Sequence, residues 1–116
     1  MPVNTMTQPT FYVLTALAGG PRHGYGIVGE VSDLSQDRVR LKIGTLYGVL
    51  NRLVDDGLVE LDREEVQQGR LRRYYRLTEA GSQSLAEVAA RQAADAKVAV
   101  DRLRAWRPAN EFGASR

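Results

Sequence analysis

The chain contains no cysteine, one histidine and no long apolar run. Without cysteine there is no disulfide framework, no thiolate nucleophile and no thiolate-based metal site. The single histidine, His23, makes neither a metal site nor a catalytic dyad by itself. No stretch approaches the roughly 18 apolar residues of a transmembrane helix, and the start lacks the pattern of a signal peptide. We therefore expect a cytoplasmic protein without a metal or cofactor, and an enzyme is the least favoured class.

Net charge is also small, because 16 basic residues oppose 14 acidic ones. Their distribution is uneven: residues 38–52 and residues 70–76 each contain four basic side chains and no acidic one. Two separated basic windows on an otherwise acidic chain indicate a surface that binds a polyanion. The alternative is that these arginines are solvated or pair with acidic neighbours, namely Asp55, Asp56, Glu64 and Glu65. Charge alone does not decide between the two interpretations.

Apolar residues at helical spacing predict three short helices in the first half of the chain. With 116 residues and 43% apolar content, the chain suits one compact domain with a modest core. The segment SQDRVR is interpreted as the connection between the second and third helices. The predicted buried positions are Phe11, Leu14, Leu17 and Ala18 in the first helix, Ile27, Val28, Val31 and Leu34 in the second, and Leu46, Val49, Leu50, Leu53 and Val54 in the third.

The third helix, within KIGTLYGVLNRLVDDGLVE (residues 42–60), has small or polar residues opposite its apolar stripe. Glycine in a helix costs about 0.8–1 kcal/mol relative to alanine, so Gly44 and Gly48 need a reason to be there. Residues without side chains allow the start of a helix to approach a phosphate, which the free N–H groups and the dipole attract. Gly57 follows the last apolar residue and is predicted to form a left-handed cap.

The residues after this helix predict a hairpin. Leu58–Val66 and Leu71–Leu77 are strand-like, and the loop between them offers Gly69 for a positive φ. A two-stranded hairpin is not stable alone, so we expect it to lean on the helices through Tyr75 and Leu77.

A long helix is predicted after Thr78, a good N-cap residue. Roughly 28 residues span about 40 Å, which is more than so small a domain can cover. The apolar stripe therefore needs a partner, and a second copy of the chain is the simplest one; the alternative is a helix that folds back over its own domain. Pro108 is expected to end the helix. The predicted stripe is Leu85, Val88, Ala89, Ala93, Ala96, Val100 and Leu103, followed by Trp106.

The order of three helices, a hairpin and a long helix predicts a mainly α fold, a winged helix-turn-helix with a long C-terminal dimerisation helix. The predicted division is a flexible segment 1–8, a DNA-binding domain 9–77, a dimerisation helix 78–107 and a disordered tail 108–116. Lys42 and Arg52 would flank the recognition helix, and residues 70–73 would lie at the tip of the wing. A protein–protein interaction module that has this fold but does not bind DNA is the alternative, because fold does not determine function.

Three motifs, GPRHGYGI (residues 20–27), GTLYGVLNRLVDDGLVE (residues 44–60) and RRYYRLTEAG (residues 72–81), resemble the PadR family of winged-helix transcription regulators. The resemblance covers roughly residues 10–85. It implies a dimer, usually a repressor of an operator in double-stranded DNA, and many such proteins respond to phenolic acids or flat hydrophobic compounds. The length is similar to that of the short form with one C-terminal helix.

The resemblance also implies roles for individual residues. Thr45 and Tyr47 would contact DNA, with packing as the alternative for Tyr47, while Leu46 would be core. Trp106 would stack on an effector between subunits or only anchor the helix. The effector residues expected are Trp106, Phe11, Tyr12 and Val100; the DNA-contacting residues expected from pattern and resemblance are Arg40, Lys42, Gly44, Thr45, Tyr47, Gly48, Asn51, Arg52, Arg70, Arg72 and Arg73.

Several remaining residues receive simple interpretations. His23 is expected to cap the second helix or to pack near the turn of the motif. Tyr25 is expected in the core, and Tyr74 either contacts the DNA backbone or packs. The Asp55–Asp56 pair is interpreted as a solvated helix end, because adjacent residues on a helix point about 100° apart.

Overall fold

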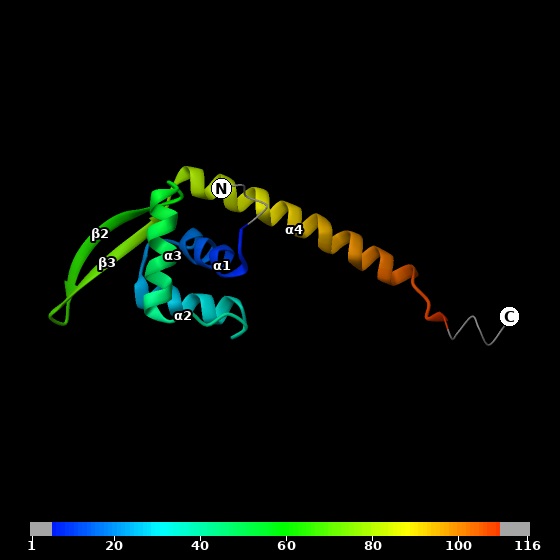
Figure 1. Ribbon diagram of the computed structural model, residues 1–116, viewed down its shortest axis with the longest axis horizontal. Coiled ribbons are helices and arrows are strands. Elements are labelled where there is room, and N and C mark those ends of the chain that lie inside the picture. The colour runs from blue at the N-terminus through cyan, green and yellow to red at the C-terminus, as the bar shows by residue number, and fades with distance from the viewer. Residues whose placement is uncertain (1–5, 110–116) are drawn as a thin grey trace.

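The structure, a computed structural model, describes residues 6–109 and over that range contains four α-helices and one small antiparallel sheet (Figure 1). This arrangement confirms the predicted mainly α winged helix-turn-helix. The predicted flexible ends, 1–8 and 108–116, lie mostly outside the described residues, although Gln8 already belongs to the first helix. The elements are α1 (Gln8–Ala18), β1 (Arg22–His23), α2 (Gly24–Leu34), α3 (Ile43–Asp55), β2 (Val59–Gln67), β3 (Arg70–Leu77) and α4 (Glu79–Ala105).

The core lies where α1, α2 and α3 meet the base of the hairpin, and most predicted positions are in it. Three predictions of burial are wrong, those for Ala18, Leu34 and Val54, and three are only partly right, those for Phe11, Val28 and Val49. Ala18 is exposed and Phe11 only partly buried, while Val13 and Ala16 are buried instead. Leu34 and Val54 are exposed because each lies in the last turn of its helix, beyond the elements that cover it. The buried apolar cluster is Val13, Leu14, Ala16, Leu17, Ile27, Val31, Val39, Leu46, Leu50, Leu53, Val59 and Tyr75.

The turn between α2 and α3 is organised by a buried serine. Ser35 Oγ accepts a hydrogen bond of 2.9 Å from the Val39 N–H, and it lies 3.2 Å from the Val39 carbonyl oxygen, to which it can donate. Gln36 and Asp37 have φ values of 53° and 63°, which non-glycine residues seldom adopt. The hydrogen bonds of the Ser35 side chain therefore fix the conformation of the turn that leads into α3.

The hairpin is part of a three-stranded sheet with the order β1-β3-β2. Its turn consists of Gln68 and Gly69, and both have positive φ, as a type I′ turn requires. The base rests on the helices through buried Tyr75 and partly buried Leu77, as predicted. Strand β1 was not predicted, because two residues are too few to show a periodic pattern.

Thr78 joins the end of α3 to the start of α4. Its Oγ1 accepts a hydrogen bond of 3.0 Å from the Gly81 N–H, which confirms the predicted N-cap. The same hydroxyl donates to the Gly57 carbonyl oxygen over 2.7 Å. Gly57 has a φ of 77°, as predicted for the residue that ends the third helix. The two helices are therefore held in a fixed relation at this corner.

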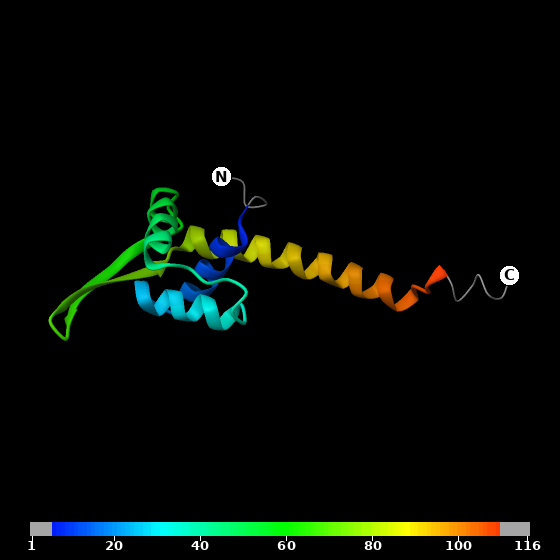
Figure 2. The same cartoon turned by 60° about the horizontal axis from the view of Figure 1, so that its bottom comes forward.

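Helix α4 leaves the domain after about three turns and extends away from it (Figures 1 and 2). Leu85 packs against the core and Val88 is buried, so the start of the helix belongs to the domain. From Ala89 to the end of the helix every residue is exposed. The helix does not fold back over its own domain. Within residues 6–109, no helix combines the length and the apolar character that crossing a membrane would require.

Candidate nucleic-acid interface

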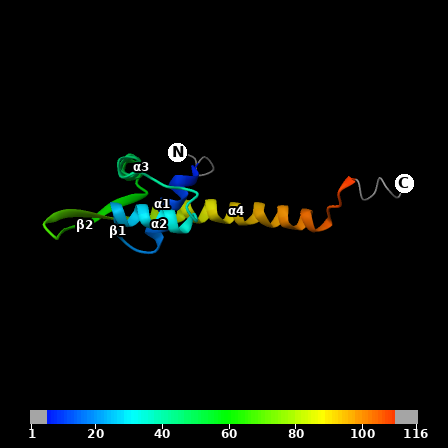
Figure 3. The same cartoon turned by 90° about the horizontal axis from the view of Figure 1, so that it is seen from below.

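Helix α3 and the hairpin lie together at the end of the molecule opposite the free part of α4 (Figures 1 and 3). The hairpin projects beyond α3, so the exposed side of the helix and the strand β3 belong to one region. The α3 part of the first basic window and the second basic window are therefore brought to the same end of the fold.

The exposed face of α3 has almost no side chain at its centre. Gly44, Gly48 and Asn51 follow one another along it, with Thr45 and Arg52 beside them, and all five are exposed. A Cβ atom added at Gly44 or Gly48 would meet no atom within 4 Å. The packing of the protein therefore does not require glycine at either position. An approaching partner would explain both.

The start of α3 is open to an anion. Lys42 occupies the N-cap position and makes no capping hydrogen bond with its side chain, and no acidic residue lies in the first turn. The first N–H groups of a helix have no partner within the helix, and together they attract negative charge. This end of the helix suits a phosphate.

The arginines of the wing divide into paired and unpaired groups. Arg73 Nε donates to Glu64 Oε2 over 3.0 Å, and this hydrogen bond raises the pKa of the guanidinium. Arg76 pairs with Glu60 and Asp62. The alternative of acidic pairing is thus correct for these two arginines, but of the four acidic partners expected only Glu64 pairs, within the described range, with an arginine of a basic window. Among residues 6–109, neither Arg70 nor Arg72 forms a salt bridge.

Most basic residues of the first window, residues 38–52, have no acidic partner among the residues that the structure describes. Arg40 lies 3.5 Å from Asp37 in an exposed pair, which contributes little to stability. In the described part of the chain, Lys42 and Arg52 make no salt bridge. These cations are available to an external anion.

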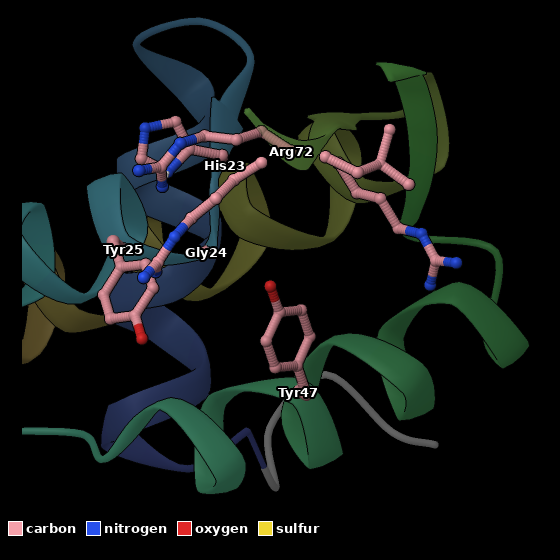
Figure 4. Close-up of a pocket in the computed structure, with 8 residues that line it drawn as sticks. His23, Gly24, Tyr25, Tyr47 and Arg72 are labelled. Atoms are coloured by element: carbon pink, nitrogen blue, oxygen red, sulfur yellow. Dashed lines mark hydrogen bonds between the residues drawn. The ribbon is translucent and has the colours of Figure 1, made fainter. Parts of the chain in front are cut away.

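A pocket of about 130 Å³ lies between the start of α2, the edge of α3 and strand β3 (Figure 4). Tyr47 of α3 lies across the pocket from His23, Tyr25 and Arg72. Its hydroxyl is so close to Gly24 that an added Cβ there would lie 2.7 Å away. Tyr47 is 37% exposed, so it both packs and remains accessible. The lining residues are His23, Gly24, Tyr25, Tyr47, Arg70, Leu71, Arg72 and Arg73.

His23 caps α2, as predicted. Its Nδ1 accepts a hydrogen bond of 3.2 Å from the Gly26 N–H, so this nitrogen carries no proton. Tyr74 packs edge-on against the ring with a centroid distance of 5.3 Å. Partial burial, and then the positive charge of Arg72, lower the pKa of His23 below its ordinary value of 6.5. The neutral ring is the form that the fold requires.

Stability should fall on acidification because of this histidine. A lowered pKa in the folded state means that the contribution is complete above about pH 6.5 and is lost as the pH falls through the lowered value. Protonation at Nδ1 removes the acceptor for Gly26, and losing a cap costs about 1 kcal/mol. His23→Asn keeps an acceptor that does not titrate. Melting curves between about pH 7.5 and 5 should show a steeper loss for the native chain than for this variant; parallel profiles would contradict the assignment.

One residue near the pocket differs from its expected position. Tyr25 is not in the core, because 58% of it is exposed. His23 and Tyr25 both line the pocket, and neither was predicted to belong to a binding site. The signal in the sequence was the short segment RHGYG, which spans β1 and the start of α2; the helix begins at Gly24, inside this segment and not after it. No group of three or more histidine or carboxylate side chains within residues 6–109 is placed to hold a metal ion.

Comparison with known proteins identifies the family. The model of the transcriptional regulator PadR-like family matches residues 13–87. The chain belongs to the PadR family. A transcriptional regulator of Mycobacterium tuberculosis, Rv3488, is 40% identical over 76 residues, which cover 66% of this chain and 67% of the relative. An uncharacterised protein of Lysinibacillus sphaericus is 33% identical over 76 residues, covering 66% of this chain and 70% of the relative.

Solved structures agree with this assignment. Bacillus subtilis PadR in complex with operator DNA is similar with a TM-score of 0.62 and 25% identity, covering 71% of this chain and 46% of that one. A PadR family transcriptional regulator of Eggerthella lenta gives a TM-score of 0.62 and 27% identity, covering 78% of this chain and 80% of that one. The chain is a PadR-type transcriptional regulator and not an enzyme.

The residues predicted for an effector site do not lie together within a single chain of this protein. Phe11 and Tyr12 lie on α1, with their rings edge-on at 5.6 Å. Val100 and Trp106 lie at the far end of α4, and Trp106 is 61% exposed. A single chain therefore does not form the expected pocket, and only a second copy could bring these residues together.

The residues predicted for dimerisation divide in the same way. Leu85 is partly buried and Val88 is buried against the domain in the single chain, so their burial is explained without a second copy. The others are exposed and follow one line along α4 at alternating steps of four and three residues, as in the seam of a coiled coil. They are Ala89, Ala93, Ala96, Val100 and Leu103.

Proposed function

We propose that the protein is a dimeric transcriptional repressor that binds a near-palindromic operator in double-stranded DNA. The observation that carries the proposal is the bare, uncapped face of α3 beside the unpaired arginines of the wing. A helix of this kind enters the major groove with its N-terminal part against the base edges, and the wing reaches the adjacent backbone or minor groove. The family relationship to a protein crystallised with operator DNA supports it.

The contacts divide into two kinds. Lys42, Arg52, Arg70 and Arg72 bind phosphates, because each is exposed or partly exposed and has no carboxylate partner among the described residues. Asn51 is the side chain at the centre of the exposed face of α3 that can read a base edge, and its carboxamide can form two hydrogen bonds with adenine. Thr45 and Tyr47 flank it.

Dimerisation uses the exposed seam of α4. Three of the five seam residues, Ala89, Ala93 and Ala96, have small side chains, which allows two helices to approach closely. An effector, a flat hydrophobic or phenolic compound, would bind where the end of α4 meets its partner and change the spacing of the two winged domains. Such an effector couples two sites through a subunit interface.

The test is a titration of the protein with duplex DNA from upstream of its coding region at several salt concentrations. Neutralising several phosphates should give log K that falls steeply with log salt. Arg52→Ala and Arg70→Ala should each reduce the magnitude of that slope by about one. Arg76→Ala is the matched control, because Glu60 and Asp62 already neutralise Arg76, and the slope should hardly change. A slope near zero for the native protein would favour the interaction module without DNA binding.

The glycines of α3 give a second prediction. Gly44→Ala with Gly48→Ala should stabilise the fold by about 1 kcal/mol per substitution, because each Cβ meets open space. The same change should weaken DNA binding about tenfold or more, because two methyl groups hold the helix away from the duplex. Gly29→Ala, in the exposed part of α2, should stabilise without affecting binding. Thermal melting and the titration measure both effects, and unchanged DNA affinity in the double variant would count against the interface.

A further inference from the structure

We propose that the pocket between α2, α3 and β3 binds one phosphate of the DNA backbone, and that Tyr25 and Tyr47 donate their hydroxyls to it beside the Arg72 guanidinium. The inference rests on the proposed DNA-binding function and adds Tyr25 as a contact and His23 as a positioning residue. Neither was part of the predicted site.

The chemistry of the pocket suits an anion. Three arginines, two tyrosines and one histidine line it, and no acidic side chain does. Arg72 forms no salt bridge among residues 6–109, and its Nε is buried without a hydrogen-bond acceptor there. That nitrogen is closed to solvent, so a ligand in the pocket would pair with the charge of the partly exposed Arg72 side chain and not with Nε itself. A phosphate in the pocket would give this cation the partner that the protein lacks.

The position of the pocket favours the backbone of a duplex as the source of that phosphate. When α3 lies in the major groove and the wing reaches the adjacent minor groove, one sugar–phosphate strand separates the two. The pocket lies between α3 and β3 (Figure 4), so the sugar–phosphate strand of a duplex bound in this way would pass over it. Its volume of about 130 Å³ exceeds the roughly 30 Å³ that one water occupies in the liquid, which leaves room for a phosphate group.

The lining residues have distinct roles. Arg72 supplies charge and hydrogen bonds, and its Cζ lies 5.8 Å from the centre of the Tyr25 ring. Tyr25 is 58% exposed, although it is large and apolar over most of its surface; a contact with DNA accounts for that exposure. His23 positions Arg72, because its Nδ1 lies 3.5 Å from Arg72 Nη1 while it accepts the Gly26 N–H.

Single methylphosphonate substitutions in the upstream duplex test the assignment. Each removes the charge of one backbone phosphate. In the native protein several positions in each half-site should lose affinity, and the position that faces the pocket should lose about tenfold. Arg72→Gln should weaken binding to the unmodified duplex about tenfold. A methylphosphonate at the position that faces the pocket should cause no further loss of affinity in this variant, because the two changes remove the same interaction. Arg76→Gln, four residues along the same strand and already paired, is the control and should behave as the native protein does.

Tyr25→Phe separates the pocket from general charge effects. It should weaken binding about three- to tenfold at an unchanged salt slope, because the hydroxyl is uncharged. Unchanged binding in Tyr25→Phe, or a loss from Arg72→Gln that adds to every methylphosphonate equally, would overturn the phosphate site while leaving the proposed function intact. Inorganic phosphate at constant ionic strength should compete only weakly; saturable competition below 1 mM that Arg72→Gln abolishes would assign the pocket to free phosphate instead. A native protein that binds no duplex at any salt concentration overturns both proposals.

Discussion

Replacing Gly81 with alanine should lower the free energy of unfolding by about 2–3 kcal/mol, the largest loss expected for a single methyl group in this protein. Gly81 is buried in the first turn of α4. An added Cβ would overlap the Leu58 carbonyl oxygen and would lie 2.8 Å from Leu77 Cδ1. Both neighbours belong to the base of the hairpin, and a backbone carbonyl cannot turn aside as a flexible side chain can. The start of α4 would have to move away from the sheet.

That movement would also strain the junction with α3. The Thr78 hydroxyl donates to the Gly57 carbonyl oxygen and accepts from the Gly81 N–H. A displaced α4 would lose both its N-cap hydrogen bond and the hydrogen bond that connects it to the end of α3. Urea unfolding followed by circular dichroism measures the effect. Gly29→Ala is the control, because its Cβ meets no atom within 4 Å and should stabilise by about 0.5–1 kcal/mol. Equal stability of Gly81→Ala and the native chain would show that α4 does not pack on the hairpin as described.

Introducing glutamates at Val100 and Leu103 should convert the proposed dimer into a monomer. These side chains are 47% and 66% exposed in the single chain and lie on the seam proposed for α4. In a symmetric dimer each substitution places like charges on both helices and removes apolar burial. A monomer cannot bind both half-sites at once. Its DNA affinity should therefore be about 100-fold lower or more, because the two winged domains no longer bind as one unit.

The measurement combines light scattering with the DNA titration. The winged domain should keep its circular dichroism signal, because both residues lie far from its core. Val98→Glu is the matched control: Val98 is 54% exposed but lies about 200° around the helix from Ala96, on the opposite side from the seam. A variant that stays dimeric, or a native protein that is monomeric at micromolar concentration, would refute this interface.

Much of the fold follows from local pattern. Apolar spacing located the three short helices, and Gly57, Thr78 and Gly69 in the QQGR segment marked where elements end, although the turn itself is only Gln68 and Gly69. The errors occur where burial depends on distant parts of the chain. Leu34 and Val54 continue an apolar stripe, but no other element reaches the last turn of either helix. Tyr25 is apolar enough for a core and lies instead at the rim of a pocket.

The binding site was predicted less completely. The acid-free windows identified the two basic regions, but not which arginines are free, since that depends on strand register. In the sheet Glu64 lies opposite Arg73, and a bulge between Leu61 and Arg63 changes the alignment next to Arg76. Cross-strand neighbours interact directly, so these pairings neutralise two of the four wing arginines. The pocket needs three elements brought together, and no local pattern encodes it.

Hydrogen exchange of the native protein, with and without duplex DNA from its upstream region, tests the central claim most directly. If one face formed by α3 and the wing binds the duplex, added DNA should slow exchange in residues 43–55 and 67–73. Residues 92–105 of α4 should exchange at the same rate in both states, because they lie at the other end of the molecule. Protection confined to α4, or bound DNA that leaves α3 unchanged, would contradict the account.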